Sequence, residues 1–255
     1  MKPFSIVNCV FILLLFSCNK DDSQPEQQDE FETFTSSICD NVIGPRALYW
    51  DYAHSLPVPL TEIPSITEFG SQYINSQYPG LGLQLPPNYT ATDVIVPQTQ
   101  TIGVNVLRED GNVLWRYLPT STFQGQVDVN AIIGFEIDTM TDILEFNGTP
   151  DVLCTTTQQS IVGGFFEGTF GARLIEFGNF TALIWVNNLY DSSLGLTFSS
   201  ISVSLAPTAE YDAIVFDVFL PFSFQLLIIK DEIRDSDADG FPDDQDNFPF
   251  DPNRH

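Results

Sequence analysis

Basic residues are scarce in this chain of 255 residues: 9 Lys and Arg stand against 34 Asp and Glu, which gives a formal net charge of −25. Within residues 38–230 the basic side chains are only Arg46, Arg108, Arg116, Arg173 and Lys230. Such a surface repels phosphate backbones, so nucleic acid is excluded as a partner. The acidity favours solubility and cation binding instead.

Motifs for nucleophilic catalysis are also lacking. No G-x-S-x-G pattern surrounds a serine anywhere in the chain. Asp51, His54 and Ser55 stand close together in the sequence, but the members of a catalytic triad converge in space rather than along the chain. We therefore interpret His54 as a surface or capping residue.

Long apolar runs are missing as well, since a membrane-spanning helix needs about 20 apolar residues. The one marked apolar run, from Phe4 to Phe16, is shorter than that and follows a single basic residue, Lys2. A charged start, a short apolar core and a small residue, Ser17, before the cut are typical of a secretory signal peptide.

Leu15-Phe16-Ser17-Cys18 resembles the lipobox of bacterial lipoproteins. The resemblance implies cleavage after residue 17 and acylation of Cys18, with palmitate as one of the chains, so that Cys18 becomes a lipidated N-terminus. Several acyl chains together make a stable membrane anchor. A plain signal peptide cleaved elsewhere is the alternative.

The next residues, Asn19-Lys20-Asp21-Asp22, resemble the surface-export signal of lipoproteins in the Bacteroidota. This resemblance implies a protein of the cell outer membrane that faces the exterior, although an ordinary solvated tether explains the same residues and a periplasmic orientation stays open. Residues 19–37 are acidic and rich in Gln, so we expect a flexible tether there.

The four cysteines separate by position. Cys9 leaves with the signal peptide and Cys18 takes lipid, so Cys39 and Cys154 remain as an even pair in an oxidising setting. A disulfide between them closes a long loop and contributes about 4 kcal/mol by chain entropy. Two buried free thiols are the alternative.

Residues 38–230 show mainly strand signals. We expect hairpins around Asp110-Gly111 and Gly178-Asn179, because Gly and Asn tolerate a positive φ. The segments expected along the chain are strands 102–107 and 113–118, a helix 130–146, strand 152–156, a bend at 163–171, strands 172–177, 180–189 and 196–205, a helix from 209 that ends at Pro221, and strand 222–229.

This pattern predicts an α+β domain, with one largely antiparallel sheet and about two helices on one face, followed by a short calcium-binding tail at residues 231–255. No resemblance to a known family is found in residues 31–230. The chain holds 22 Phe, which either fill the core or, if they form exposed rows, line an apolar ligand pocket.

Residues 235–246 carry the clearest chemical motif. Carboxylates at every second position can converge on one hard cation, and Gly240 permits the sharp turn that this requires. Ca²⁺ prefers six to eight oxygen ligands in a flexible geometry, whereas Mg²⁺ demands an octahedron. The expected ligands are the side chains of Asp235, Asp237, Asp239, Asp243 and Asp246 with the carbonyl oxygen of Phe241.

The spacing differs from that of an EF-hand, because Asp246 stands where that loop ends in Glu, and Pro242 and Pro249 prevent an exit helix. Residues 235–253 instead resemble a thrombospondin type-3 repeat, which implies calcium as the bound ion. A disordered acidic tail is the alternative.

Together these features predict a lipid-anchored, surface-exposed calcium-binding lipoprotein, a non-catalytic binding or structural protein of the outer membrane. Lipid on Cys18 would join it to that membrane, and a glycan, a peptide or an apolar molecule would be its external ligand. The competing hypothesis is a secreted-type hydrolase that works through Glu136, Asp138 or Asp142. We interpret these acids as the solvated face of the helix at 130–146, so the sequence favours a protein that is not an enzyme without deciding the question.

Overall fold

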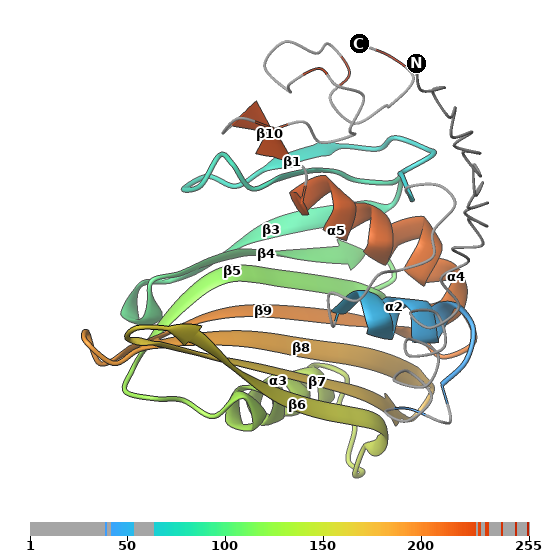
Figure 1. The fold of residues 1–255 in the computed structure, drawn as a ribbon. Helices are drawn as coiled ribbons and strands as arrows, with labels where there is room; N and C mark the ends of the chain where they lie inside the picture. The colour runs from blue at the N-terminus through green and yellow to red at the C-terminus, as the bar shows by residue number, and fades with distance from the viewer. Residues whose placement is uncertain are drawn as a thin grey trace, which may run out of the picture.

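The computed structural model describes residues 39, 42–53, 64–227, 229–230, 233–234, 241, 248 and 254. Within them, seven antiparallel strands form one sheet in the order β3-β4-β5-β9-β8-β7-β6, which confirms the expected α+β class and the antiparallel sheet (Figure 1). These strands are β3 (Tyr89–Val96), β4 (Thr101–Arg108), β5 (Leu114–Gln124), β6 (Asp151–Gly163), β7 (Phe166–Phe177), β8 (Phe180–Asp191) and β9 (Leu196–Pro207).

Smaller elements surround this sheet. Two further pairs of short strands are β1 (Gln72–Ile74) with β2 (Gly82–Gln84), and β10 (Ile229–Lys230) with β11 (Ile233–Arg234). The helical segments are α2 (Pro45–Ala53), the 3₁₀ turn η1 (Pro97–Thr99), α3 (Val129–Ile143), α4 (Tyr211–Ile214), the π turn η2 (Val215–Phe219) and α5 (Leu220–Leu227).

The turn residues place the hairpins where the sequence predicts them. Gly111 joins β4 to β5 with a φ of +73°, and Gly178 joins β7 to β8 with a φ of +58°. Positive φ values of this size are readily adopted by glycine, which has no Cβ. The resulting registers pair Leu107 with Leu114 and Phe177 with Phe180.

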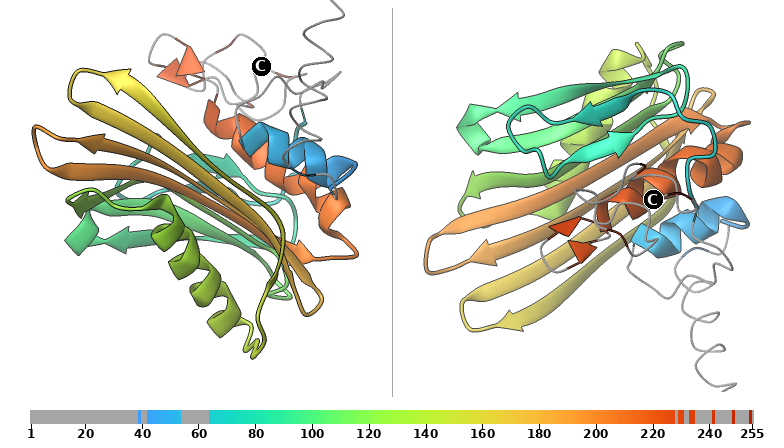
Figure 2. Two further views of the ribbon diagram at one scale, coloured as in Figure 1. Left: turned by 60° about the horizontal axis from the view of Figure 1, so that its bottom comes forward. Right: turned by 90° about the horizontal axis from the view of Figure 1, so that it is seen from above.

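Helices cover the sheet on both faces, so the expectation of helices on one face is wrong. Helix α3 lies on one face, here called the outer face, and α2, α4, η2 and α5 lie on the other, the inner face (Figure 2). In β8, Leu183 points to the inner core and Ile184 to the outer core, and both are fully buried. A central strand covered on both faces reads as a continuous apolar run, as residues 182–186 do.

Helix α3 confirms the helix expected at residues 130–146. Asp128 caps its start by accepting a hydrogen bond from the backbone N–H of Asn130, at 2.9 Å. The helix approaches β7 closely, because a Cβ added at Gly171 would lie 2.8 Å from a methyl carbon of Val129. The absence of a side chain at Gly171 therefore lets α3 pack closely against β7 on the outer face.

One side chain of α3 departs from the expected apolar stripe. Ile133 and Met140 are buried, as the periodicity predicts, but Ile143 is 67% exposed. Leu144, four residues after Met140, is partly buried against the outer core in its place.

The C-terminal part of the domain corrects a second expectation. Pro221 does not end the helix, and residues 222–227 are helical rather than a strand. Proline has no N–H to donate within a helix, and the π turn η2 stands directly before α5, where the regular hydrogen-bond pattern is interrupted. The Ser223 hydroxyl donates to the carbonyl oxygen of Phe219 at 2.9 Å and satisfies one acceptor of this irregular segment.

Helix α2 is a helix that sequence periodicity does not indicate. It places Tyr49 and Trp50 in the inner core, where Tyr49 stacks on Phe219 with ring centroids 5.7 Å apart. Two aromatic side chains bury much apolar surface from a short segment. Tertiary packing therefore stabilises this helix more than its own sequence does.

Candidate binding surface on the inner face

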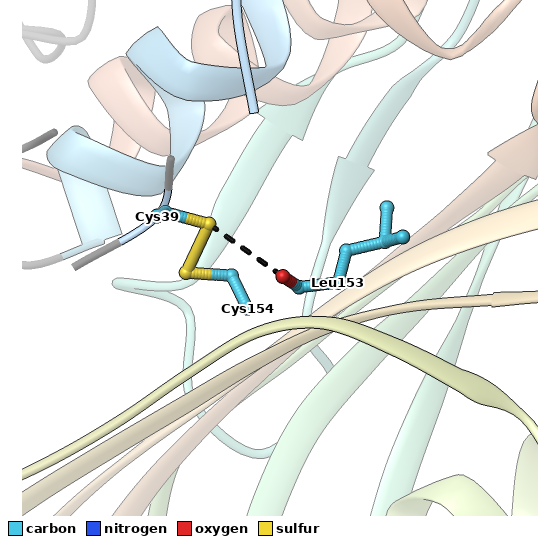
Figure 3. Close-up of a disulfide and its surroundings, with 3 residues drawn as sticks. All are labelled: Cys39, Leu153 and Cys154. Carbon is cyan, nitrogen blue, oxygen red and sulfur yellow. Dashed lines mark hydrogen bonds between the residues drawn. A yellow bond between two sulfur atoms is a disulfide. The ribbon is translucent and has the colours of Figure 1, made fainter. Parts of the chain in front are cut away.

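The two cysteines that the sequence pairs lie together in the structure. Cys39 and Cys154 form a disulfide whose Cα atoms are 5.5 Å apart, and both residues are buried (Figure 3). The Cys39 sulfur also lies 3.9 Å from the carbonyl oxygen of Leu153. The bond ties the segment before α2 to β6, which is an edge strand of the sheet.

The other site residues predicted from the sequence lie outside the described residues, with one exception. Phe241 is described and is 41% exposed. No group of three or more His, Cys, Asp or Glu side chains suited to a metal occurs among the residues that the structure describes. The residues outside the description are Cys18, Asp235, Asp237, Asp239, Asp243 and Asp246.

The expectation that Glu136 faces solvent is wrong, whereas Asp138 and Asp142 are exposed as expected. Only 2% of Glu136 is exposed, and its carboxylate lies 3.1 Å from Nε of Arg116. Arg116 comes from β5 beneath α3, and its Nη1 donates to the side-chain oxygen of Asn105 at 2.9 Å.

Burial raises the pKa of Glu136, while the neighbouring Arg116 lowers it. A hydrolase with two catalytic carboxylates needs them to face each other across a pocket. Glu136 faces a guanidinium instead, so its geometry serves the attachment of α3 to the sheet.

Asp51 is the described member of the Asp51–His54–Ser55 cluster. It lies in α2, is 8% exposed, and has its pKa raised to about 6 by burial. His54 and Ser55 lie outside the described residues, so the surface or capping role of His54 stays a prediction.

The inner face of the sheet is covered over only part of its length. At one end of the central strands, Leu174, Leu183 and Ser204 are buried at 1% exposure or less beneath the helices. The strands β6–β9 then run on past the ends of α2 and α5 (Figure 1). This leaves a second part of the same face without that helical cover.

Strand register identifies the side chains on this second part, because paired residues lie on the same face and positions alternate along each strand. Trp185 lies between Ser202 of β9 and Ala172 of β7. One step further out Asn187 lies between Ser200 and Phe170.

Asn187 is exposed although β8 is a central strand, so none of the described helices covers it. In the next row outward, Phe198 of β9 lies between Leu189 of β8 and Thr122 of β5. We call the exposed and half-buried side chains of these three rows the open inner face: Tyr117, Thr122, Thr156, Gln158, Phe170, Trp185, Asn187, Leu189, Phe198 and Ser200.

The open inner face combines aromatic rings with neutral hydrogen-bonding groups. None of its members is charged, in a protein whose formal net charge is −25. Burial raises the pKa of the Tyr117 hydroxyl, a hydrogen bond with Ser200 lowers it, and nearby Tyr78 raises it. Tyr78 belongs to the connection between β1 and β2, so this connection lies near Tyr117.

Trp185 carries a polar atom without a partner. Its indole N–H is shielded from solvent and finds no hydrogen-bond acceptor among the described residues. A shielded donor in this condition is costly, and its presence in a native fold calls for an explanation.

Sequence reasoning missed this surface because exposure of an alternating strand depends on which elements cover it. In the structure, residues 185 and 187 alternate with the buried Val186 and Asn188, but the apolar and polar residues of this segment do not alternate in the sequence. The sequence does not show how far the helical layer extends over the sheet, because that extent depends on α2 and on the continuation of α5 past Pro221.

Comparisons with known proteins add little to this picture. No family model matches the sequence, and no curated protein is significantly similar to it. Among solved structures, the chain is similar to LpqN, which is involved in cell envelope biogenesis of Mycobacterium tuberculosis, with 14% identity over 58% of this chain and 82% of LpqN. The TM-score is 0.28, which does not establish a common fold. In the described part of this chain, no helix is long and apolar enough to cross a membrane.

Proposed function

We propose that this chain is a lipid-anchored protein of the cell envelope that binds an external ligand, without catalysis, on the open inner face. One observation supports the binding function most strongly: Asn187 is exposed in the middle of the sheet. It lies beside the half-buried Trp185 on its own strand and opposite the half-buried Phe170 on β7. Aromatic side chains with a few placed polar groups are the usual lining of ligand sites.

The anchor and the calcium site of this proposal rest on sequence motifs. The apolar run from Phe4 to Phe16, with Cys18 shortly after it, supports lipid attachment to an outer membrane, and Lys20-Asp21-Asp22 supports exposure to the exterior. The six ligands proposed from Asp235 to Asp246 are hard oxygen donors, which suit Ca²⁺. In this proposal calcium orders the tail and takes no part in chemistry.

A ligand screen of residues 31–255 tests the binding function. The probes are neutral oligosaccharides, palmitate and extended peptides, and the readout is the intrinsic tryptophan fluorescence, to which Trp185 contributes together with the buried Trp50 and Trp115. We expect one class to change the fluorescence saturably in the wild type and to bind at least about tenfold more weakly to Asn187→Ala, which loses a hydrogen-bonding group. If no class binds, or if binding is equal in both proteins, the proposed function is wrong.

A further inference from the structure

We infer that the ligand of the open inner face is a neutral oligosaccharide. This inference rests on the proposed binding function and specifies its ligand. The first argument is charge: the open inner face has no cationic side chain to pair with a carboxylate, sulfate or phosphate. The negative charge of the whole protein further disfavours an anionic ligand.

The second argument is the mixture of side chains. Across one row, Ser200, Asn187, Phe170 and Gln158 follow one another on neighbouring strands, so that amide and hydroxyl groups lie beside an aromatic ring. An acyl chain lying on this row would remove the amides of Asn187 and Gln158 from water without pairing them, which is costly.

A pyranose ring matches this row better than an acyl chain does. Its C–H face packs on an aromatic ring, and its hydroxyl groups around the edge donate to and accept from amides and hydroxyls. Asn and Gln side chains supply both donors and acceptors, which a sugar hydroxyl needs. Each polar group of the row therefore finds a partner in the same ligand that covers Phe170.

The third argument is the spread of aromatic rings. Trp185, Phe170 and Phe198 lie on three adjacent strands, β8, β7 and β9, and Tyr78 lies near Tyr117. Rings distributed in this way contact several sugar units rather than one. The ligand class is therefore an oligosaccharide or a polysaccharide chain.

The indole N–H of Trp185 fits the same inference. It has no acceptor among the described residues, and a sugar hydroxyl that reaches it after a small side-chain adjustment would satisfy it. Peptide carbonyls would satisfy the indole as well. The experiment therefore includes peptides as a competing class.

Isothermal titration calorimetry of residues 31–255 tests the inference. The probes are hexasaccharides of glucose, mannose, galactose and xylose, with heparin fragments, palmitate and an extended neutral peptide as the competing classes. We expect saturable binding of at least one neutral hexasaccharide. We expect Asn187→Ala to weaken it about tenfold or more, and Phe170→Leu, which keeps an apolar side chain but removes the ring, to weaken it as well.

Phe135→Ala is the matched control, because Phe135 is an aromatic residue that is 64% exposed on α3, on the outer face. It should bind like the wild type, and circular dichroism should show all three variants folded. The inference is overturned if no neutral hexasaccharide binds, or if the binding is unchanged in both Asn187→Ala and Phe170→Leu. Binding of palmitate or the peptide alone, with loss in Asn187→Ala, would overturn the saccharide inference while the proposed binding function stands.

Discussion

At the scale of single residues, burial decides what the few charged side chains of the domain do. Glu136 and Arg116 join α3 to the sheet as an ion pair in which the carboxylate is almost fully buried. Removing one partner of such a pair leaves the other charge without compensation. Replacing both partners by apolar side chains removes that problem.

We therefore expect Glu136→Leu to lower the free energy of unfolding by about 3 kcal/mol, because Arg116 then stays beneath α3 without its carboxylate. The double variant Arg116→Met with Glu136→Leu should recover most of that loss. Urea denaturation of both variants at pH 7 measures the difference. An unchanged stability in Glu136→Leu would show that the pair does not hold α3 on the sheet.

Asp51 gives a prediction with a defined pH window. Its pKa is about 6 in the folded protein, above the value of about 4 for an unfolded chain. The folded state thus holds the proton more tightly, so ionised Asp51 destabilises the fold above pH 6 and has no such effect below pH 4.

Asp51→Asn should accordingly raise the free energy of unfolding by about 1–2 kcal/mol at pH 7 and change it little at pH 4. Denaturation curves of wild type and variant at both pH values provide the test. A gain of equal size at the two pH values would contradict the pKa argument.

At the scale of elements, the disulfide holds the segment before α2 against the edge strand β6. It closes a loop of 115 residues along the chain. A bond that closes a loop of this length restricts the unfolded chain and contributes about 4 kcal/mol. We expect Cys39→Ser with Cys154→Ser to lose stability by about that amount in urea denaturation.

Oxidised protein from its native compartment should also resist alkylation at both cysteines until it is reduced. Mass spectrometry after iodoacetamide treatment measures this directly. Complete alkylation without prior reduction would show that Cys39 and Cys154 are free thiols.

The elements differ in how far the sequence predicts them, and the difference has a physical basis. The hairpins at Gly111 and Gly178 and the helix α3 are encoded locally, by turn residues, a capping side chain and a clear period. Helix α2 is short and stabilised by core packing, so its sequence has no such signal. The strand predicted after Pro221 is wrong because a π turn lets the helix continue through proline, which usually ends a helix.

The features of the candidate site also differ in whether the local sequence or the tertiary packing determines them. The cysteine pair is predicted by counting, because only Cys39 and Cys154 remain to pair if residues 1–18 are a lipoprotein signal. Burial of Glu136 depends on Arg116, which is distant in sequence and lies beneath the helix. The open inner face depends on where the helical layer stops, and no local pattern records that.

At the scale of the whole molecule, the proposed lipid anchor and the proposed calcium tail precede and follow the folded domain in the sequence. Cys18→Ala should abolish incorporation of labelled palmitate and release the protein from the membrane fraction, because the acyl chains then have no thiol to attach to. Metabolic labelling and fractionation measure both effects. Labelled palmitate in the variant would refute the lipoprotein interpretation.

Calcium should order the tail without stabilising the domain. At millimolar calcium, a site with a Kd on the order of 10⁻⁴ M is largely occupied and gains about 1.4 kcal/mol from binding. Asp239→Ala removes a central ligand, so calorimetry should detect calcium binding in the wild type and much less in the variant. Equal binding heats in the two proteins would exclude this loop as the calcium site.

The central claim, that the open inner face binds the ligand, is tested most directly by hydroxyl-radical footprinting. Residues 31–255 are labelled with and without the hexasaccharide that binds best, and mass spectrometry locates the protected side chains. The account predicts protection of Trp185, Phe170 and Phe198, with unchanged labelling of Phe135 and Ile143 on α3. Protection of α3, with unchanged labelling of the three aromatic side chains on the inner face, would contradict it.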